Sequence, residues 1–85
     1  MKVTVLYFAQ FRENLGIHSE EVLLDKASAT VGDVLDCVRK RSQEHATVLA
    51  NTKRVRMARN EELCFADRRI HEGDTIAFFP PVTGG

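Results

Sequence analysis

The sequence predicts an α+β domain in which one main helix packs across one face of a small mixed β-sheet. Runs rich in β-branched and aromatic residues occur in both halves of the chain. A single clear amphipathic helix pattern separates them, and one helix on one sheet face satisfies this order. The 85 residues leave room for one domain only.

The chain begins with a strand pattern at residues 3–8 (VTVLYF). Its apolar side chains fall on both faces of the strand, with Tyr7 on one face and Leu6 and Phe8 on the other. One helix covers only one of these faces, so the other is available for a neighbouring protein. Residues 9–15 are then expected to form one or two helical turns that the following glycine ends.

A second short strand is expected at residues 20–24, and the clearest helix signal follows it. Thr30 is a good N-cap, and Asp33 stands at the capping-box position. The apolar residues after this cap are spaced as one stripe of a helix: Val31, Val34, Leu35 and Val38. A further helical piece is expected at residues 43–50.

The second half of the chain returns to strands. Residues 54–59 and 63–65 have strand patterns, and residues 60–62 turn the chain between them. A turn at Gly73 then leads into a strongly apolar final strand, residues 75–79 (TIAFF).

The most informative segment is the end of the sequence, residues 80–85 (PPVTGG), which follows the final strand directly. We therefore expect a folded domain over residues 1–79 and an extended tail over residues 80–85. Prolines fix φ and favour an extended path, so six residues reach on the order of 20 Å from the domain. Glycine has no Cβ, so nothing crowds the terminal carbonyl of Gly85. The other tail residues are expected to insert into a narrow site of another protein: Pro80, Pro81, Val82, Thr83 and Gly84.

The composition argues against several classes of function. Twelve basic and twelve acidic side chains cancel, which is untypical of a dedicated nucleic-acid binder. No window approaches the ~18 apolar residues of a membrane span, and Met1 and Lys2 lead directly into a strand pattern without a signal segment. Cys37 and Cys64 lie in apolar patterns and are expected to be buried, free thiols. We therefore expect a cytoplasmic protein that binds neither nucleic acid nor membrane.

The chain lacks the apparatus for catalysis. Its glycines form no phosphate-binding loop, and its three histidines are scattered outside any metal-binding motif. Paired carboxylates such as Glu61 and Glu62 are better explained as solvated charge. We expect no metal and no bound cofactor, so catalytic groups must come from partner proteins.

Four segments carry a resemblance to a known family: residues 8–13 (FAQFRE), 58–60 (ARN), 73–74 (GD) and 78–85 (FFPPVTGG). They are similar to the small subunit of molybdopterin synthase, a family with the ubiquitin-like β-grasp fold. The resemblance covers the whole chain in length and element order, and the PPVTGG ending is its most specific part.

This resemblance implies a sulfur carrier that is not an enzyme on its own. An adenylating enzyme similar to the ubiquitin-activating family would use ATP to activate the carboxylate of Gly85, and sulfur would then replace AMP to leave a thiocarboxylate (1-thioglycine). The large, catalytic subunit of molybdopterin synthase would receive the tail, and the sulfur would build the dithiolene of molybdopterin from cyclic pyranopterin monophosphate. The implied assembly of the two subunits is a heterotetramer.

We expect the large subunit to dock on the sheet face opposite the helix, through Phe8, Leu63 and Phe79. Large exposed apolar patches commonly mark protein contacts. The alternative is that Phe8 or Phe79 belongs to the core, in which case a charged residue at position 79 would prevent folding.

A second candidate surface is basic. It comprises Lys53, Arg54, Arg56 and Arg59, with Arg68 and Arg69 nearby. A solvated sheet edge that charge protects from aggregation is the favoured interpretation. Steering toward an acidic patch on the adenylating enzyme is the alternative.

Three other functions stay open. A β-grasp carrier could deliver sulfur to thiamine, cysteine or tRNA instead of to molybdopterin. A ubiquitin-like modifier would join Gly85 to lysines of target proteins. A plain interaction domain would have an inert tail, and the removal of Gly85 would change nothing.

Overall fold

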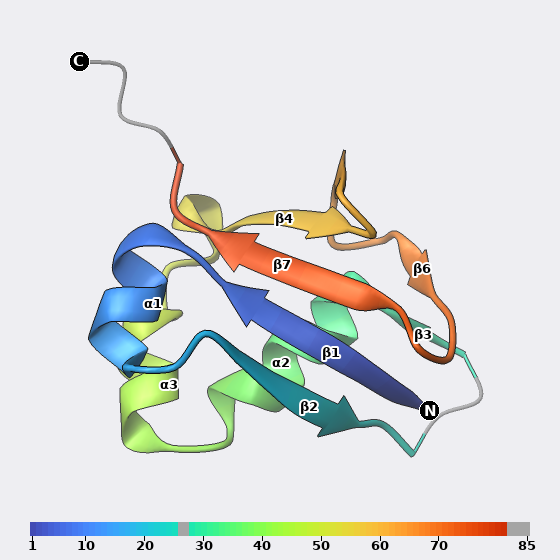
Figure 1. Cartoon of the computed structure of the whole chain (residues 1–85), viewed down its shortest axis with the longest axis horizontal. Helices are drawn as coiled ribbons and strands as arrows, with labels where there is room; N and C mark the ends of the chain where they lie inside the picture. The colour runs from blue at the N-terminus through green and yellow to red at the C-terminus, as the bar shows by residue number, and fades with distance from the viewer. Residues whose placement is uncertain (26–27, 82–85) are drawn as a thin grey trace.

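The computed structural model describes residues 1–25 and 28–81 (Figure 1). The elements of the first half are β1 (Lys2–Tyr7), α1 (Ala9–Leu15), β2 (Ser19–Leu23), β3 (Ala29–Thr30), α2 (Val31–Arg39) and α3 (Gln43–Val48). The second half contains the 3₁₀ turn η1 (Thr52–Arg54), β4 (Arg56–Arg59), β5 (Glu62–Cys64), β6 (Arg69–Ile70) and β7 (Thr75–Phe79).

Five strands form one mixed sheet in the order β2-β1-β7-β4-β5. The last strand, β7, lies in the centre, parallel to β1 and antiparallel to β4. β3 and β6 form a separate two-stranded sheet. Figure 1 shows α2 behind the strands of the main sheet, so the predicted α+β class with one main helix across one sheet face is confirmed.

The core lies between α2 and the sheet. The predicted apolar stripe of α2 is buried throughout, with Val31, Val34 and Val38 at 0% exposure. On the sheet, Tyr7 and Phe78 are the largest side chains among those that are fully buried. Burial of such side chains supplies the main driving force of folding, at about 1.5–3 kcal/mol for each large apolar residue.

Local sequence signals set the ends of the helices. The predicted capping box is present: the Thr30 hydroxyl accepts a hydrogen bond from the Asp33 backbone N–H at 3.2 Å, and the Thr30 N–H donates to Asp33 Oδ2 at 2.9 Å. α1 ends at Gly16, which adopts φ 73° and donates its N–H to the Arg12 carbonyl at 2.9 Å. A glycine meets this left-handed geometry without strain.

Some sequence expectations are wrong in detail. The strand expected at 54–59 begins at Arg56, because the preceding residues close the 3₁₀ turn η1. The β3–β6 sheet was not expected, since strands of two residues show no alternation that a sequence pattern can register. Cys37 and Cys64 are free thiols as expected, yet both are half-buried at the margin of the core rather than fully inside it.

Candidate functional site

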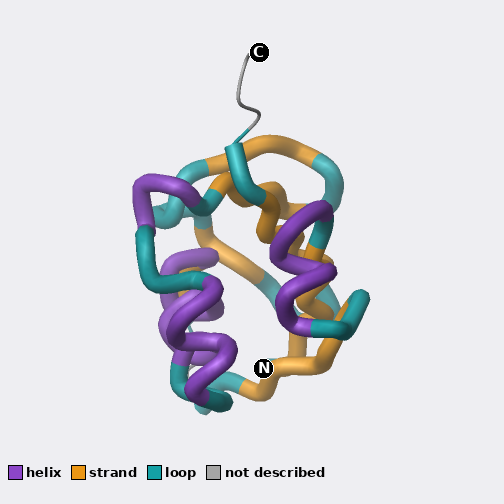
Figure 2. Tube along the Cα trace, turned by 90° about the vertical axis from the view of Figure 1, so that its left-hand side faces the viewer, coloured by secondary structure: helices purple, strands orange, loops and turns teal. Residues whose placement is uncertain are grey.

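The base of the tail is held in the middle of the sheet. β7 pairs with β1 on one side, where Tyr7 lies opposite Phe78, and with β4 on the other, where Arg56 lies opposite Phe79. The Phe8 N–H donates to the Phe78 carbonyl at 3.2 Å, which extends the pairing beyond the end of β1. β7 ends at Phe79, and Figure 2 shows the chain leaving the sheet there. The tail therefore starts from a fixed point.

The face of the sheet away from α2 carries an apolar row across four strands. Strand register places Leu6 beside Ala77, Ala77 beside Ala58, and Ala58 beside Leu63. The two central positions are alanines, whereas larger side chains stand at the ends of the row. Small residues in the middle and large ones at the rim produce a shallow hollow of about 520 Å³.

The three residues predicted for the partner interface meet at this hollow. Phe8, Leu63 and Phe79 all contribute to its lining. Phe8 is 44% exposed and Leu63 is 75% exposed, and Phe79 is half-buried. The structure places none of the three among the buried core residues, so the alternative that Phe8 or Phe79 is a core residue is wrong. Their contact with a partner stays a prediction.

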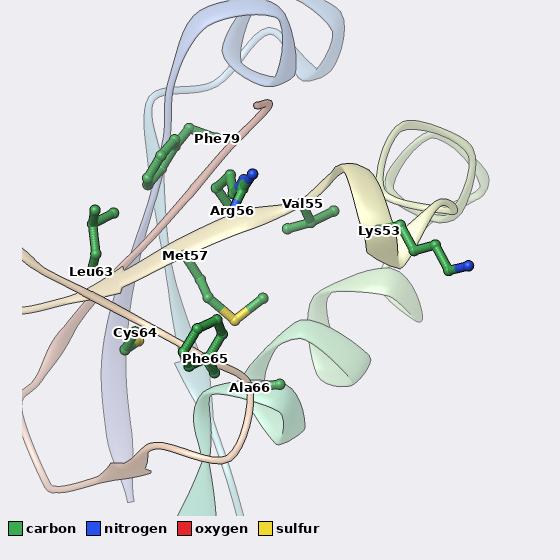
Figure 3. A pocket seen from close by; sticks show the side chains of 9 residues that line it. All are labelled: Lys53, Val55, Arg56, Met57, Leu63, Cys64, Phe65, Ala66 and Phe79. Carbon is green, nitrogen blue, oxygen red and sulfur yellow. The ribbon is translucent and has the colours of Figure 1, made fainter. Parts of the chain in front are cut away.

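Sequence reasoning missed one exposed aromatic residue. Phe65 is 80% exposed, directly after the edge strand β5. It lines a second hollow of about 770 Å³ that also includes Leu63 and Phe79 (Figure 3). The available signal was a large apolar residue two positions after Leu63, within the strand expected at residues 63–65. Burial raises the pKa of the Cys64 thiol in this hollow, which keeps it protonated and a poor nucleophile.

The structure distinguishes Arg59 from the other residues of the predicted basic surface. Arg59 is not a free surface cation, because its Nε donates to Asp74 Oδ2 at 2.7 Å. Asp74 also accepts from Asn60 Nδ2 at 3.0 Å and from the His71 backbone N–H at 2.7 Å. Burial raises the pKa of Asp74, but these hydrogen bonds outweigh it and hold that pKa below its usual range. Arg59 therefore fixes the β4–β5 turn to the start of β7.

The predicted reactive residue, Gly85, lies outside the described residues, as do Val82, Thr83 and Gly84. Pro80 and Pro81 follow β7 outside any strand. The division into a domain over residues 1–79 and a tail over residues 80–85 stays a prediction. Within residues 1–25 and 28–81, no three His, Cys, Asp or Glu side chains gather as a metal site would require. No helix in the same ranges has the length and apolarity needed to cross a bilayer.

The main sheet packs on one main helix, and its central strand, β7, is the last strand before the tail. This arrangement defines a ubiquitin-like protein of the β-grasp class. The chain belongs to the ThiS family, whose model matches residues 5–85. It is 39% identical to the molybdopterin synthase sulfur carrier subunit of Escherichia coli, over 98% of this chain and 99% of that one.

Solved structures agree with this class. SAMP1 of Haloferax volcanii matches with a TM-score of 0.80 at 29% identity, and the match covers 100% of both chains. A chain from the complex of subunits 1 and 2 of the molybdopterin-converting factor of Helicobacter pylori matches with a TM-score of 0.67 over 100% of both chains. At 20% identity, this second likeness concerns the fold alone. The β-grasp fold that the resemblance implied is confirmed.

Proposed function

We propose that this chain is the sulfur carrier subunit of a molybdopterin synthase, a non-catalytic subunit that donates sulfur from its C-terminus. Similarity to the Escherichia coli carrier subunit over nearly the whole of both chains is the observation that carries the proposal. The anchored base of the tail supports it, because a carrier must present its terminus while its domain stays folded. Two free cysteines suit a reducing compartment, and we place the protein in the cytoplasm.

The proposed chemistry takes place at the Gly85 carbonyl carbon. A carboxylate is a poor electrophile, so a partner adenylating enzyme first joins its oxygen to the α-phosphate of ATP and releases pyrophosphate. Sulfide then attacks the carbonyl carbon and expels AMP, with loss of one proton, to leave a thiocarboxylate. The ionised sulfur is nucleophilic in the way that a thiolate is. It forms a C–S bond to a carbon of the pterin precursor as a C–O bond of that carbon breaks, and the oxygen leaves from that carbon. Water then cleaves the acyl–sulfur bond, which leaves the sulfur on the pterin and restores the carboxylate.

The apolar hollow is the proposed docking site of the large synthase subunit. Phe8, Leu63 and Phe79 offer exposed apolar area beside the point where the tail leaves, so docking there would direct the tail into the partner. Phe79→Asp is expected to weaken binding to the large subunit at least tenfold and to leave the monomer folded, because this side chain is not buried in the core. Leu23→Asp is the matched control, since Leu23 is 71% exposed on the distant edge strand β2. Equal binding by both variants would contradict this docking site.

Intact-mass spectrometry tests the proposed function directly. The chain is incubated with ATP, sulfide and the adenylating enzyme of the same organism, and it should gain the mass of one oxygen-to-sulfur exchange at Gly85. A chain without Gly85 should gain nothing. The sulfurated chain, the large subunit and cyclic pyranopterin monophosphate together should then yield molybdopterin. A sulfurated chain that gives no molybdopterin would indicate a carrier for another acceptor.

The likeness to SAMP1, a protein described as a small archaeal modifier, supports one second candidate, a ubiquitin-like protein modifier. A modifier would form isopeptide bonds between Gly85 and lysines of other proteins. Conjugates of this kind in cell extract, together with an absence of the sulfur-bearing free chain, would favour it over the carrier.

A further inference from the structure

The sheet face away from α2, the open face, carries a cation at one end of β4 and an anion at the other. Arg56 shares this face with Ala58, because side chains alternate along a strand and the two residues are two positions apart. Figure 3 shows Arg56 on the same side of the β4 ribbon as Leu63 and Phe79. Glu61 lies in the turn that follows β4 and lines the apolar hollow. The apolar row of the open face therefore lies between two opposite charges.

Both charges are exposed and uncompensated. Among the described residues, neither Arg56 nor Glu61 forms an ion pair, whereas Arg59 is paired with Asp74. Glu61 also has a φ of 71°, a left-handed value that glycine adopts with less strain. A strained residue beside a candidate binding face supports a role for its side chain. The two charges are thus available to a partner on the open face.

Strand register makes the open face complementary to itself. A two-fold axis that passes through Ala58, perpendicular to the sheet, exchanges the two neighbours of this residue in the apolar row. Leu63 of one copy then lies over Ala77 of the other, because both flank Ala58 at the same strand spacing of about 4.8 Å. The same rotation carries Arg56, two residues before Ala58, over the turn that holds Glu61. A large side chain thus meets a small one, and a cation meets an anion.

We propose that the open face binds a second copy of this chain in a symmetric dimer. Leu63 of each copy enters the apolar hollow of the other, and Arg56 of each copy pairs with Glu61 of the other. A two-fold interface requires that one surface contain both members of every contact. Here one axis satisfies the apolar contact and the charged contact together, a match that a partner of different sequence would not require.

The overall charge of the chain permits this contact. Twelve basic and twelve acidic side chains leave no net charge, so two copies do not repel each other. Leu63 is 75% exposed in the monomer and would be covered in the dimer. The dimer goes beyond the proposed function and does not depend on it. It uses the face proposed for the large subunit, so the second copy and the large subunit exclude each other.

Sedimentation velocity tests the dimer with the full chain alone. The wild type should pass from monomer to dimer as its concentration rises. Arg56→Glu places two carboxylates opposite each other in both symmetric contacts, and Glu61→Arg places two cations there. Each of these variants should dimerise more weakly than the wild type, by about tenfold or more in the dissociation constant.

A mixture of the two variants tests the pairing itself. In a mixed dimer every cation faces a carboxylate again, so the mixture should associate at least about tenfold more tightly than either variant alone. The double variant Arg56→Glu, Glu61→Arg should regain self-association for the same reason. Lys40→Glu and Glu44→Arg change the net charge equally at exposed positions near α2 and α3, and they are the matched controls. Alone or mixed, the controls should stay within about threefold of the wild type.

The apolar contact is tested by Leu63→Ala, which should weaken the dimer about tenfold. Leu23→Ala is the control and should not, since Leu23 is equally exposed but lies on the distant edge strand β2. Urea unfolding of each variant establishes that the fold is retained, which the exposure of the substituted side chains favours.

Three outcomes would overturn the dimer: a wild type that stays monomeric, single variants that dimerise like their controls, or a mixture that associates no better than its components. Binding of the large subunit by a chain that never dimerises would mean that the open face serves that subunit alone. Sulfur loading of the wild-type chain is measured separately. Normal loading without a dimer refutes only this inference, whereas a dimer that gains no sulfur refutes only the proposed function.

Discussion

Replacement of Asp74 by asparagine is expected to weaken the join between the β4–β5 turn and the start of β7. Asp74 is 7% exposed and accepts hydrogen bonds from Arg59, Asn60 and the His71 N–H. Asparagine keeps the shape but removes the charge and turns one acceptor into a donor, which then faces N–H groups. Asparagine keeps one acceptor oxygen, so one or two of the three bonds are lost. At about 1.5–3 kcal/mol for each hydrogen bond to a charged group, the free energy of unfolding should fall by about 3 kcal/mol. A domain of this size has roughly 5–10 kcal/mol in total.

The effect has a pH signature. Because the hydrogen bonds to Asp74 outweigh its burial, the pKa of the folded state lies below that of the unfolded state. This carboxylate therefore stabilises the fold fully above the unfolded pKa of about 3.9, and the contribution is lost as the pH falls through the folded pKa. Asp74→Asn has no such contribution to lose, so its stability should decline less steeply than that of the wild type below about pH 4.

Urea unfolding, followed by circular dichroism from neutral to acid pH, measures both effects. Asp67→Asn is the control, because Asp67 is an exposed carboxylate in the turn before β6. Its free energy of unfolding should stay within about 0.5 kcal/mol of the wild type. The reasoning is refuted if Asp74→Asn loses no more stability than Asp67→Asn at neutral pH, or if both variants keep the full acid sensitivity of the wild type.

Three further changes test other parts of the fold by the same unfolding measurement. Ala9→Gly should raise the free energy of unfolding by about 0.5–1 kcal/mol, because Ala9 has a left-handed φ of 52° that glycine adopts without strain. Ala46→Gly inside α3 is the control and should lower the free energy of unfolding by a similar amount. A loss in both variants would contradict strain at Ala9. Leu35→Ala, at 2% exposure, should cost about 2–4 kcal/mol, and a cost below that range would mean that the core closes over the gap. Tyr7→Phe removes the hydroxyl that donates to Glu20 at 2.6 Å and should cost about 1–2 kcal/mol, so an unchanged urea midpoint would show that the bond adds nothing.

Features that depend on neighbours in the sequence were predictable. The capping box at Thr30 and Asp33 is formed within four residues, and the final strand at 75–79 follows from a short apolar run bounded by a turn and a proline. The apolar face around Phe8 was also predictable, because one helix cannot cover both faces of the first strand. Local chemistry decides each of these features.

Features that depend on distant pairing were not predictable. Arg59 looks like one more surface cation in the sequence. Only the pairing of β4 with β7, in which Arg59 lies opposite Ile76, brings it against Asp74, which lies 15 residues away. The half-burial of Cys64 and the exposure of Phe65 depend on where β5 leaves β4, a point that no periodicity marks. The sequence gives the charge of a residue directly, but the residue that pairs with it is known only from the fold.

The central place of β7 has a mechanical consequence. A partner that draws the tail inward applies force along the axis of this strand, and the hydrogen bonds to β1 and β4 lie on both of its flanks. Such a load shears both ladders at once, whereas an edge strand such as β2 could be peeled away one bond at a time. The domain is therefore expected to stay folded when a partner pulls on its C-terminal end.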